Sequence, residues 1–216
     1  MKSGRFITLE GIEGAGKSTI AAVLMHTLNK QGIKTCITRE PGGTPLAERL
    51  RDLLLECGKE SLSAEAETLL MFASRAVHLD NLVRPALLRG EWVICDRFTD
   101  ATRAYQGAGR GVDRHFIESL AAVVHSDLQP DLTLLLDLPV ELGLARARTR
   151  RVSQGEVMPD RFESENLEFF SRVRNAYLEI CDPSTGHYIV LDASQSQDQV
   201  AMAANRALNS LESNGQ

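Results

Sequence analysis

The stretch GIEGAGKS, from Gly11 to Ser18, decides the fold class. It has the form GxxxxGK[ST], in which glycines let backbone N–H groups wrap around a phosphate. Lys17 can reach the β- and γ-phosphates of a nucleoside triphosphate, and the hydroxyl of Ser18 can bind Mg²⁺. The apolar run 6–9 before the motif predicts a strand, and the residues after it predict a helix, whose N-terminus favours anions. A glycine-rich turn with a chance lysine would not need this context, so we predict a phosphate-binding loop (P-loop) with nucleotide-binding residues Gly11, Ile12, Glu13, Gly14, Ala15, Gly16, Lys17, Ser18 and Thr19.

Strand and helix patterns alternate along the rest of the chain. Further apolar runs without polar alternation predict strands at 33–38, 92–95, 132–136 and 187–191. Such strands, separated by helices, form a parallel sheet that is covered on both faces. We find no internal repeat and no low-complexity linker. The sequence therefore predicts one three-layer α/β domain over residues 1–216, with its functional residues at the carboxyl ends of the strands.

Helical patterns lie between these strands. They begin at residues 18, 45, 63, 113, 139, 163 and 195, with Thr44, Ser63 and Asp113 as candidate N-caps. Pro85 is expected to kink or break the helix that begins at residue 63. A glycine-rich loop is predicted at 106–111, and an irregular segment at 152–160.

Composition excludes several classes of protein. The net charge is −5, which argues against a broad nucleic-acid-binding surface. No apolar run approaches the ~18 residues of a membrane span, and the strand pattern begins too early for a signal peptide. None of the four cysteines forms a CxxC pair or has a histidine at metal-ligand spacing. We therefore expect a cytoplasmic protein with mostly buried, reduced thiols at Cys36, Cys57, Cys95 and Cys181.

Two apolar strands end in an aspartate that can orient Mg²⁺ near the P-loop. Asp96 ends one and is followed at once by Arg97, so an acid for the metal and a base for phosphate stand together. For that reason we favour Asp96 as the metal-site residue, with Ser18. Asp137 ends the other, and we expect it to cap the next helix, since aspartate is a favoured N-cap residue.

Arginines gather where loops should meet the strand ends. Arg39 and Arg97 each follow a strand, and further arginines flank the irregular segment at positions 146, 148, 150, 151 and 161. Four like charges within residues 146–151 repel one another unless an anion visits. Cations also stabilise the charge that develops on a transferred phosphoryl group. We interpret residues 146–161 as a mobile basic lid, which would exclude water from the reaction.

Other P-loop classes fit less well. A GTPase needs an NKxD-type motif, and the sequence at 29–32 is NKQG, within the first helix. An ABC or AAA ATPase would need a longer chain with its own signature elements. A catalytically inactive nucleotide-binding regulator is expected to have lost Lys17, Asp96 or the arginines, and this chain retains them. A small kinase, with P-loop, acceptor pocket and lid, remains the favoured class.

Three further motifs carry a family resemblance. At REPGGT (39–44), DRF (96–98) and AYQG (104–107) the chain resembles bacterial thymidylate kinase, over essentially its whole length. The resemblance implies a P-loop kinase fold with a five-stranded parallel sheet and a flexible lid. It implies transfer of the γ-phosphoryl group of ATP to dTMP, giving dTDP and ADP with Mg²⁺, in thymidine nucleotide synthesis. It also implies a homodimer, and the composition leads us to expect that this binds no nucleic acid and no membrane.

The resemblance also implies roles for single residues. Glu13 matches a carboxylate at the 3′-hydroxyl of the acceptor sugar, and Arg39 and Arg97 match arginines at the acceptor phosphate. Arg75 matches the arginine that reads the thymine edge. The residues that match those enclosing base and deoxyribose are Thr102, Tyr105 and Gln106.

The chain departs from the family pattern in two places. Some members carry an arginine in the P-loop where this chain has Gly14, so the catalytic arginine, acting with Lys17 and Arg97, should come from the lid. The candidates are Arg150, Arg151 and Arg161. Many members stack an aromatic residue on thymine at the position of Met71, and Phe72 is one residue later. One residue turns a helix by about 100°, so either Met71 lies against the base or the helix shifts to present Phe72, and ordinary core packing is the alternative for both.

Overall fold

The computed structural model describes residues 4–55, 61–153, 155 and 161–213. Its centre is a sheet of five parallel strands in the order β2-β3-β1-β4-β5. The strands are β1 (Phe6–Glu10), β2 (Thr35–Arg39), β3 (Trp92–Asp96), β4 (Leu132–Asp137) and β5 (Tyr188–Asp192). The predicted three-layer α/β fold with a parallel sheet is therefore confirmed. Because all five strands run the same way, their carboxyl ends meet at one edge, where the P-loop begins.

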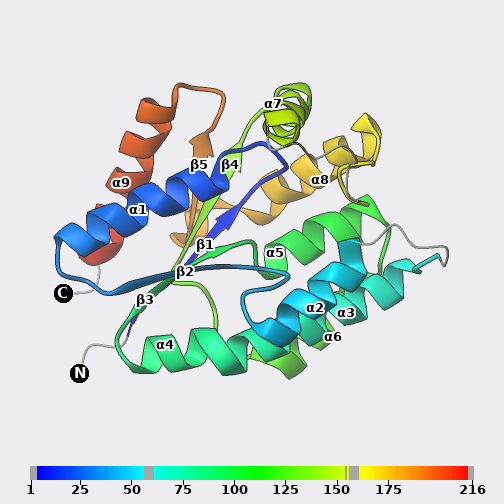
Figure 1. Ribbon diagram of the computed structural model, residues 1–216, viewed down its shortest axis with the longest axis horizontal. Coiled ribbons are helices and arrows are strands. Elements are labelled where there is room, and N and C mark those ends of the chain that lie inside the picture. The colour runs from blue at the N-terminus through cyan, green and yellow to red at the C-terminus, as the bar shows by residue number, and fades with distance from the viewer. Residues whose placement is uncertain (1–3, 56–60, 154, 156–160, 214–216) are drawn as a thin grey trace.

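Helices cover both faces of the sheet. They are α1 (Lys17–Lys30), α2 (Pro45–Leu55), α3 (Ala64–His78), α4 (Arg84–Leu88), α5 (Thr99–Thr102), α6 (Arg114–His125), α7 (Val140–Ser153), α8 (Leu167–Ile180) and α9 (Gln197–Ser213). Figure 1 shows α1 and α9 side by side on one face and α2, α3, α4 and α6 on the other.

Side chains of β1 alternate between these two layers. Ile7 and Leu9 belong to the large core that includes Leu24 of α1, whereas Phe6 packs with Leu79 and Val83 on the other face. This burial on both faces explains why the strands are apolar without alternation.

The helix that begins at Ser63 runs on through Pro85. Between α3 and α4 the chain makes a wider, π-helical turn over Leu79–Val83, directly before the proline. A proline lacks an N–H and crowds the preceding turn, and widening that turn lets the helical course continue. The helix therefore does not break at Pro85, and its distortion lies over the preceding residues Leu79–Val83.

The predicted glycine-rich loop at 106–111 is wrong for most of its length. Residues Arg103–Gly109 form a second π-helical segment. A Cβ atom at Gly109 would meet the ring of Phe169 on α8 at 2.6 Å. Packing against α8 thus requires glycine here and overrides its low helix propensity.

Two other local predictions need correction. Asp137 does not cap α7, because both of its carboxylate oxygens accept from the guanidinium of Arg174, at 2.7 and 2.8 Å. Helix α8 begins at Leu167 and not at residue 163, because the side chain of Asn166 accepts from the N–H of Phe169 and caps it. The caps expected at Ser63 and Asp113 are confirmed.

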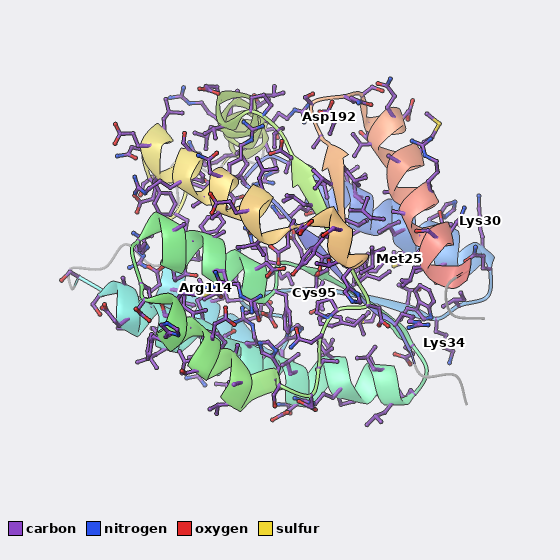
Figure 2. All side chains as sticks on the ribbon, turned by 180° about the vertical axis from the view of Figure 1, so that it is seen from behind. Met25, Lys30, Lys34, Cys95, Arg114 and Asp192 are labelled. Atoms are coloured by element: carbon purple, nitrogen blue, oxygen red, sulfur yellow. The ribbon has the colours of Figure 1, made fainter. Side chains whose placement is uncertain are left out.

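The cysteines in the described part of the chain are free thiols. Cys95 and Cys181 are buried and Cys36 is half-buried, as predicted, while Cys57 lies outside the described residues. Figure 2 shows Cys95 near the centre of the fold, whereas Lys30 and Lys34 lie at its edge. Within the described ranges no helix is both long and apolar enough to cross a bilayer.

Candidate functional site

The P-loop connects β1 to α1 at the carboxyl edge of the sheet. Gly16 precedes α1 with a φ of 91°, and Gly14 has a φ of 72°. A Cβ atom at Gly14 would run into the backbone carbonyl of Gly143 on α7. Glycine is therefore required at position 14 both by its backbone conformation and by the close approach of α7. An arginine at position 14 would not fit this packing.

Lys17 lies buried beneath the loop. Its Nζ donates to the carbonyl oxygens of Gly11 and Ile12, at 3.1 and 3.0 Å, and lies 3.9 Å from Asp96 Oδ1. Burial lowers the pKa of Lys17, and the charge of Arg97 lowers it further. The side chain is thus held where phosphate oxygens would lie over the N-terminus of α1.

The carboxylate of Asp96 has the features of a metal-site residue. Its Oδ1 is buried and accepts no hydrogen bond within the described part of the chain. An unsatisfied buried carboxylate oxygen is costly unless a cation visits it. Asp96 and Ser18 line one cavity with the P-loop, and both offer oxygen atoms, the ligands that hard cations such as Mg²⁺ prefer.

That cavity, which we call the phosphate cavity, is lined by more cationic side chains than carboxylates. Besides P-loop residues 13–19, Asp96, Leu55 and two glutamates, it is lined by Arg39, Arg51, Arg97, Arg146 and Arg150. The guanidinium of Arg39 also pairs with Glu48 at 2.9 Å and is half exposed. Such a set of cations around a helix N-terminus is suited to a polyphosphate.

Arg97 is the residue most firmly fixed at this site. It follows β3 with a φ of 73°, which is strained for a residue with a side chain. Its Nη2 donates to Glu13 Oε1 at 2.5 Å and to the Tyr105 hydroxyl at 3.0 Å. Its Nη1 donates to the Gly11 carbonyl and to the Tyr177 hydroxyl, both at 3.2 Å. These contacts hold a strained arginine between the P-loop and α8.

Two carboxylates beside Arg97 titrate very differently. Burial would raise the pKa of Glu13, but the charges of Arg97, Lys17 and Arg150 outweigh it and lower the pKa to about 2. Glu10, at the end of β1, is fully buried, and burial and the charge of Asp100 raise its pKa to about 7. Glu13 therefore stays ionised throughout the neutral range, whereas Glu10 changes charge within it.

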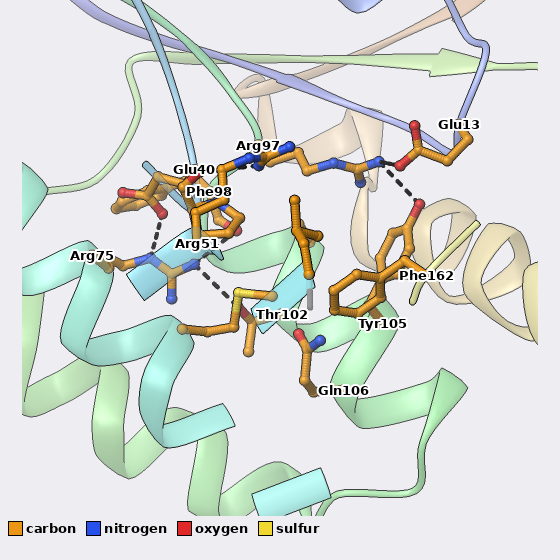
Figure 3. Close-up of a pocket in the computed structure, with 14 residues that line it drawn as sticks. Glu13, Glu40, Arg51, Arg75, Arg97, Phe98, Thr102, Tyr105, Gln106 and Phe162 are labelled. Atoms are coloured by element: carbon orange, nitrogen blue, oxygen red, sulfur yellow. Dashed lines mark hydrogen bonds and ion pairs between the residues drawn. The ribbon is translucent and has the colours of Figure 1, made fainter. Parts of the chain in front are cut away.

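A second cavity, which we call the inner pocket, adjoins the first. Figure 3 shows it. The two cavities share Glu13, Glu40, Arg51, Leu55 and Arg97. The inner pocket is completed by Pro41, Met71, Arg75, Phe98, Ala101, Thr102, Tyr105, Gln106 and Phe162. Its walls mix apolar surface with a few convergent polar groups, as in sites for small organic ligands.

Arg75 presents a buried hydrogen-bond donor at this pocket. Its Nε donates to Glu40 Oε2 at 2.7 Å, and its Nη2 donates to the Phe98 carbonyl at 3.1 Å and to Thr102 Oγ1 at 3.0 Å. Its Nη1 is buried without a hydrogen-bond acceptor among the residues described. His78 Nδ1 lies 2.9 Å from the other oxygen of Glu40 and steadies it. These contacts fix the guanidinium of Arg75 in the wall of the pocket.

The structure separates the candidate residues for the pocket. Glu13, Met71, Arg75, Arg97, Thr102, Tyr105 and Gln106 all line it. Phe72 does not line it, because its ring is buried with Val112 and Ile117 beneath the guanidinium of Arg75, which lies 4.6 Å from the ring centroid. Arg39 lines the phosphate cavity but not the inner pocket.

The candidate lid arginines also differ in whether they line a cavity. Arg150 lines the phosphate cavity, together with Arg146. Arg151 pairs with Glu163 at 2.7 Å, and Arg161 pairs with Glu67 on α3. Neither of these two lines the phosphate cavity, so Arg150 is the one of the three candidates that does. Residues 154 and 156–160 of the expected lid lie outside the described residues.

Sequence reasoning missed several residues of the site. Arg51 lines both cavities, and Tyr177 holds Arg97. A signal for Arg51 existed, since Ala47 and Leu54 are buried on the same helix and the spacing 47, 51, 54 follows one helix face. Tyr177 had no such signal, because its partners Arg97 and Glu10 are 80 and 167 residues away.

Comparison with known proteins identifies the family of this chain. Residues 9–203 match the family model described as thymidylate kinase. The chain belongs to the thymidylate kinase family. The predicted resemblance is therefore confirmed, and the chain has relatives of similar length within the family.

Two relatives and one solved structure illustrate the match. The chain is 53% identical to the thymidylate kinase of Ectopseudomonas mendocina and 52% identical to that of Pseudomonas syringae pv. tomato, with 97% of each chain covered in both cases. The crystal structure of thymidylate kinase from Ehrlichia chaffeensis superposes with a TM-score of 0.74 at 31% identity, covering 95% of this chain and 99% of that one. Members of the thymidylate kinase family therefore share its fold over nearly the full length.

Proposed function

We propose that this chain is a dTMP kinase, which transfers the γ-phosphoryl group of ATP to dTMP and gives dTDP and ADP for thymidine nucleotide synthesis. Family membership supports the reaction. The observation that carries it is the junction of a basic phosphate cavity with a half-apolar inner pocket through Glu13, Arg51 and Arg97. ATP phosphates occupy the first and the monophosphate enters the second, so that donor and acceptor meet at the shared residues.

In this proposal transfer is direct and in line, without a covalent enzyme intermediate. Lys17, Arg97 and Arg150 surround the moving phosphoryl group and stabilise the negative charge that spreads over its oxygens. The fixed position of Arg97 supports this role, because its contacts to Glu13, Tyr105 and the loop carbonyl pre-organise it. The acceptor is a phosphate, whose second pKa near 6 makes a general base unnecessary near neutral pH.

A divalent metal completes the proposed site. Asp96 and Ser18 would hold Mg²⁺ at the edge of the P-loop. When bound, the ion neutralises phosphate charge and orients the β- and γ-phosphates. Measuring the rate with and without added Mg²⁺ tests this part of the proposal. We expect the rate to depend on Mg²⁺ and to be lost when a chelator is added.

The inner pocket suits a pyrimidine nucleotide. Arg75 lines it with a guanidinium that can donate to a base carbonyl, and Met71 gives an apolar wall. Tyr105 and Thr102 close the pocket around base and deoxyribose. Glu13 remains ionised and can accept from a sugar hydroxyl.

An assay with ATP and a panel of nucleoside monophosphates tests the function. We expect dTMP to be phosphorylated most efficiently, and preference for AMP, GMP or UMP would reject the substrate while keeping the kinase class. Lys17→Ala should lower kcat by about 100-fold or more, since it removes stabilisation made mainly in the transition state. Undiminished turnover of that variant would show that the P-loop lysine has another role.

The chain is further proposed to act as a cytoplasmic homodimer. Leu46 and Leu53 on α2 and Leu69 on α3 are each at least half exposed, and they offer an apolar face on adjacent helices. The buried free thiols Cys95 and Cys181 suit a reducing compartment. Light scattering of the purified protein tests the dimer, and a monomer mass at micromolar concentration would reject it.

A further inference from the structure

Behind the inner pocket lies a buried carboxylate, Glu67 on α3. Its side chain is 1% exposed. Its Oε1 accepts from Gln106 Nε2 at 2.6 Å and from Arg110 Nε at 2.9 Å. Arg161 pairs with its other oxygen, and Arg110 also pairs with Glu165 at 2.8 Å. Two guanidinium groups thus compensate the buried charge and favour the ionised form of Glu67.

An ionised carboxylate can only accept hydrogen bonds, and this fixes its neighbour. A glutamine amide has a donor end and an acceptor end that differ little in shape. Because Glu67 can only accept, the NH₂ of Gln106 must face it. The amide oxygen of Gln106 then remains on the pocket side, where Figure 3 shows it turned toward Thr102. No donor from the described residues reaches this oxygen.

Arg75, which also lines the pocket, has the opposite hydrogen-bonding character to the amide oxygen of Gln106. Its guanidinium lines the pocket and can only donate, and its Nη2 donates to Thr102 at 3.0 Å. The pocket therefore presents a fixed donor and a fixed acceptor on either side of Thr102. A pyrimidine-2,4-dione edge has an acceptor carbonyl at C4 beside a donor N3–H and matches this pair. Cytosine has a donor amine at C4 beside an acceptor nitrogen and mismatches both groups.

We propose that Glu67 is a positioning residue that sets base specificity by fixing the amide orientation of Gln106. This inference rests on the proposed dTMP kinase function. Glu67 lines neither cavity and acts through Gln106. Loss of its charge lets the amide turn its NH₂ toward the pocket, where it can donate to the ring nitrogen of cytosine.

The test compares kcat/KM for dTMP and dCMP in full-length wild type and in Glu67→Gln. The substitution keeps shape and hydrogen-bonding capacity but removes the acceptor-only character. We expect the dTMP/dCMP ratio to fall about tenfold or more, because one well-placed base contact is worth about that factor or more. Glu165→Gln is the matched control, since it removes the other partner of Arg110 without touching Gln106, and it should keep the ratio within about twofold of wild type.

A double variant distinguishes an effect on the orientation of the amide from a general loss of structure in the pocket. In Glu67→Gln/Gln106→Glu the acceptor-only group stands at position 106 and the amide at position 67. The new carboxylate must offer an oxygen to the pocket, so discrimination against dCMP should return toward the wild-type ratio. A merely structural role for Glu67 predicts no such recovery.

A third variant covers the case in which Glu67→Gln does not fold, as judged by circular dichroism. Gln106→Met removes the pocket oxygen directly and should lower the same ratio about tenfold. An unchanged ratio in Gln106→Met, or in folded Glu67→Gln, overturns the inference. A wild-type protein that does not prefer dTMP over dCMP instead rejects the proposed function on which the inference rests.

Discussion

Glu10 should make the stability of the folded chain fall as pH rises through neutrality. Its carboxyl accepts from the Phe98 N–H at 2.7 Å and the Tyr177 hydroxyl at 2.8 Å, but burial and Asp100 raise its pKa from 4.5 to about 7. The folded protein therefore binds this proton more tightly than the unfolded chain. The stabilisation is fully present below pH 4.5 and is lost as pH rises through about 7.

The size of the effect follows from the two pKa values. A rise from 4.5 to about 7, at about 1.4 kcal/mol for each pKa unit, corresponds to about 3 kcal/mol of unfolding free energy. Glu10→Gln keeps the shape of the side chain and removes its titration. We expect the variant to gain about 2 to 3 kcal/mol relative to wild type between pH 5 and pH 8.

Urea unfolding of both proteins at several pH values measures this difference. Comparing the two proteins removes the contribution of His125, whose pKa burial and the charge of Arg75 lower to about 4. That histidine acts in the opposite direction, because its stabilisation is present above pH 6.5 and is lost as pH falls toward 4. A difference between wild type and Glu10→Gln that stays constant from pH 5 to pH 8 would refute the reasoning.

Two further pairs of variants test the assignment of neighbouring residues. Arg150→Ala should lower kcat about 100-fold, whereas Arg151→Ala should lower it less than tenfold, because Arg151 pairs with Glu163 and does not itself line the phosphate cavity. Equal losses in steady-state assays would contradict the proposed role of Arg150. Met71→Ala should raise KM for dTMP about tenfold with little effect on stability, because it removes a pocket wall. Phe72→Ala should instead lower the unfolding free energy by about 3–5 kcal/mol, because the ring is buried in the core; the reverse pattern in kinetics and urea unfolding would mean that Phe72 is the residue at the base.

Local patterns were sufficient for the sheet and the phosphate-binding loop. The GxxxxGK[ST] motif, the apolar strands and the caps at Ser63 and Asp113 each depend on residues close together in the sequence. The positions of Lys17, Asp96 and Arg97 followed from the same patterns, because parallel strands bring their carboxyl ends to one edge. The family was also evident, since its three short motifs are contiguous.

Contacts between distant segments decided the rest. Residues 103–109 are helical because α8 packs on Gly109, and no local pattern contains Phe169. Asp137 pairs with Arg174, 37 residues away, instead of capping the helix that follows it. Whether Met71 or Phe72 faces the pocket depends on how α3 is rotated, which the packing of Phe72 against α6 determines.

Within the P-loop, some features follow from the local sequence and others from tertiary contacts. Its sequence determines a phosphate-binding turn, because glycine backbone conformations and a lysine at fixed spacing are local properties. Only the tertiary structure brings Gly143 against Gly14, which leaves no room for a side chain there, and Arg97 against Glu13. It also brings Arg150 into the wall of the phosphate cavity, since the direction of a long side chain depends on the charges that surround it in three dimensions.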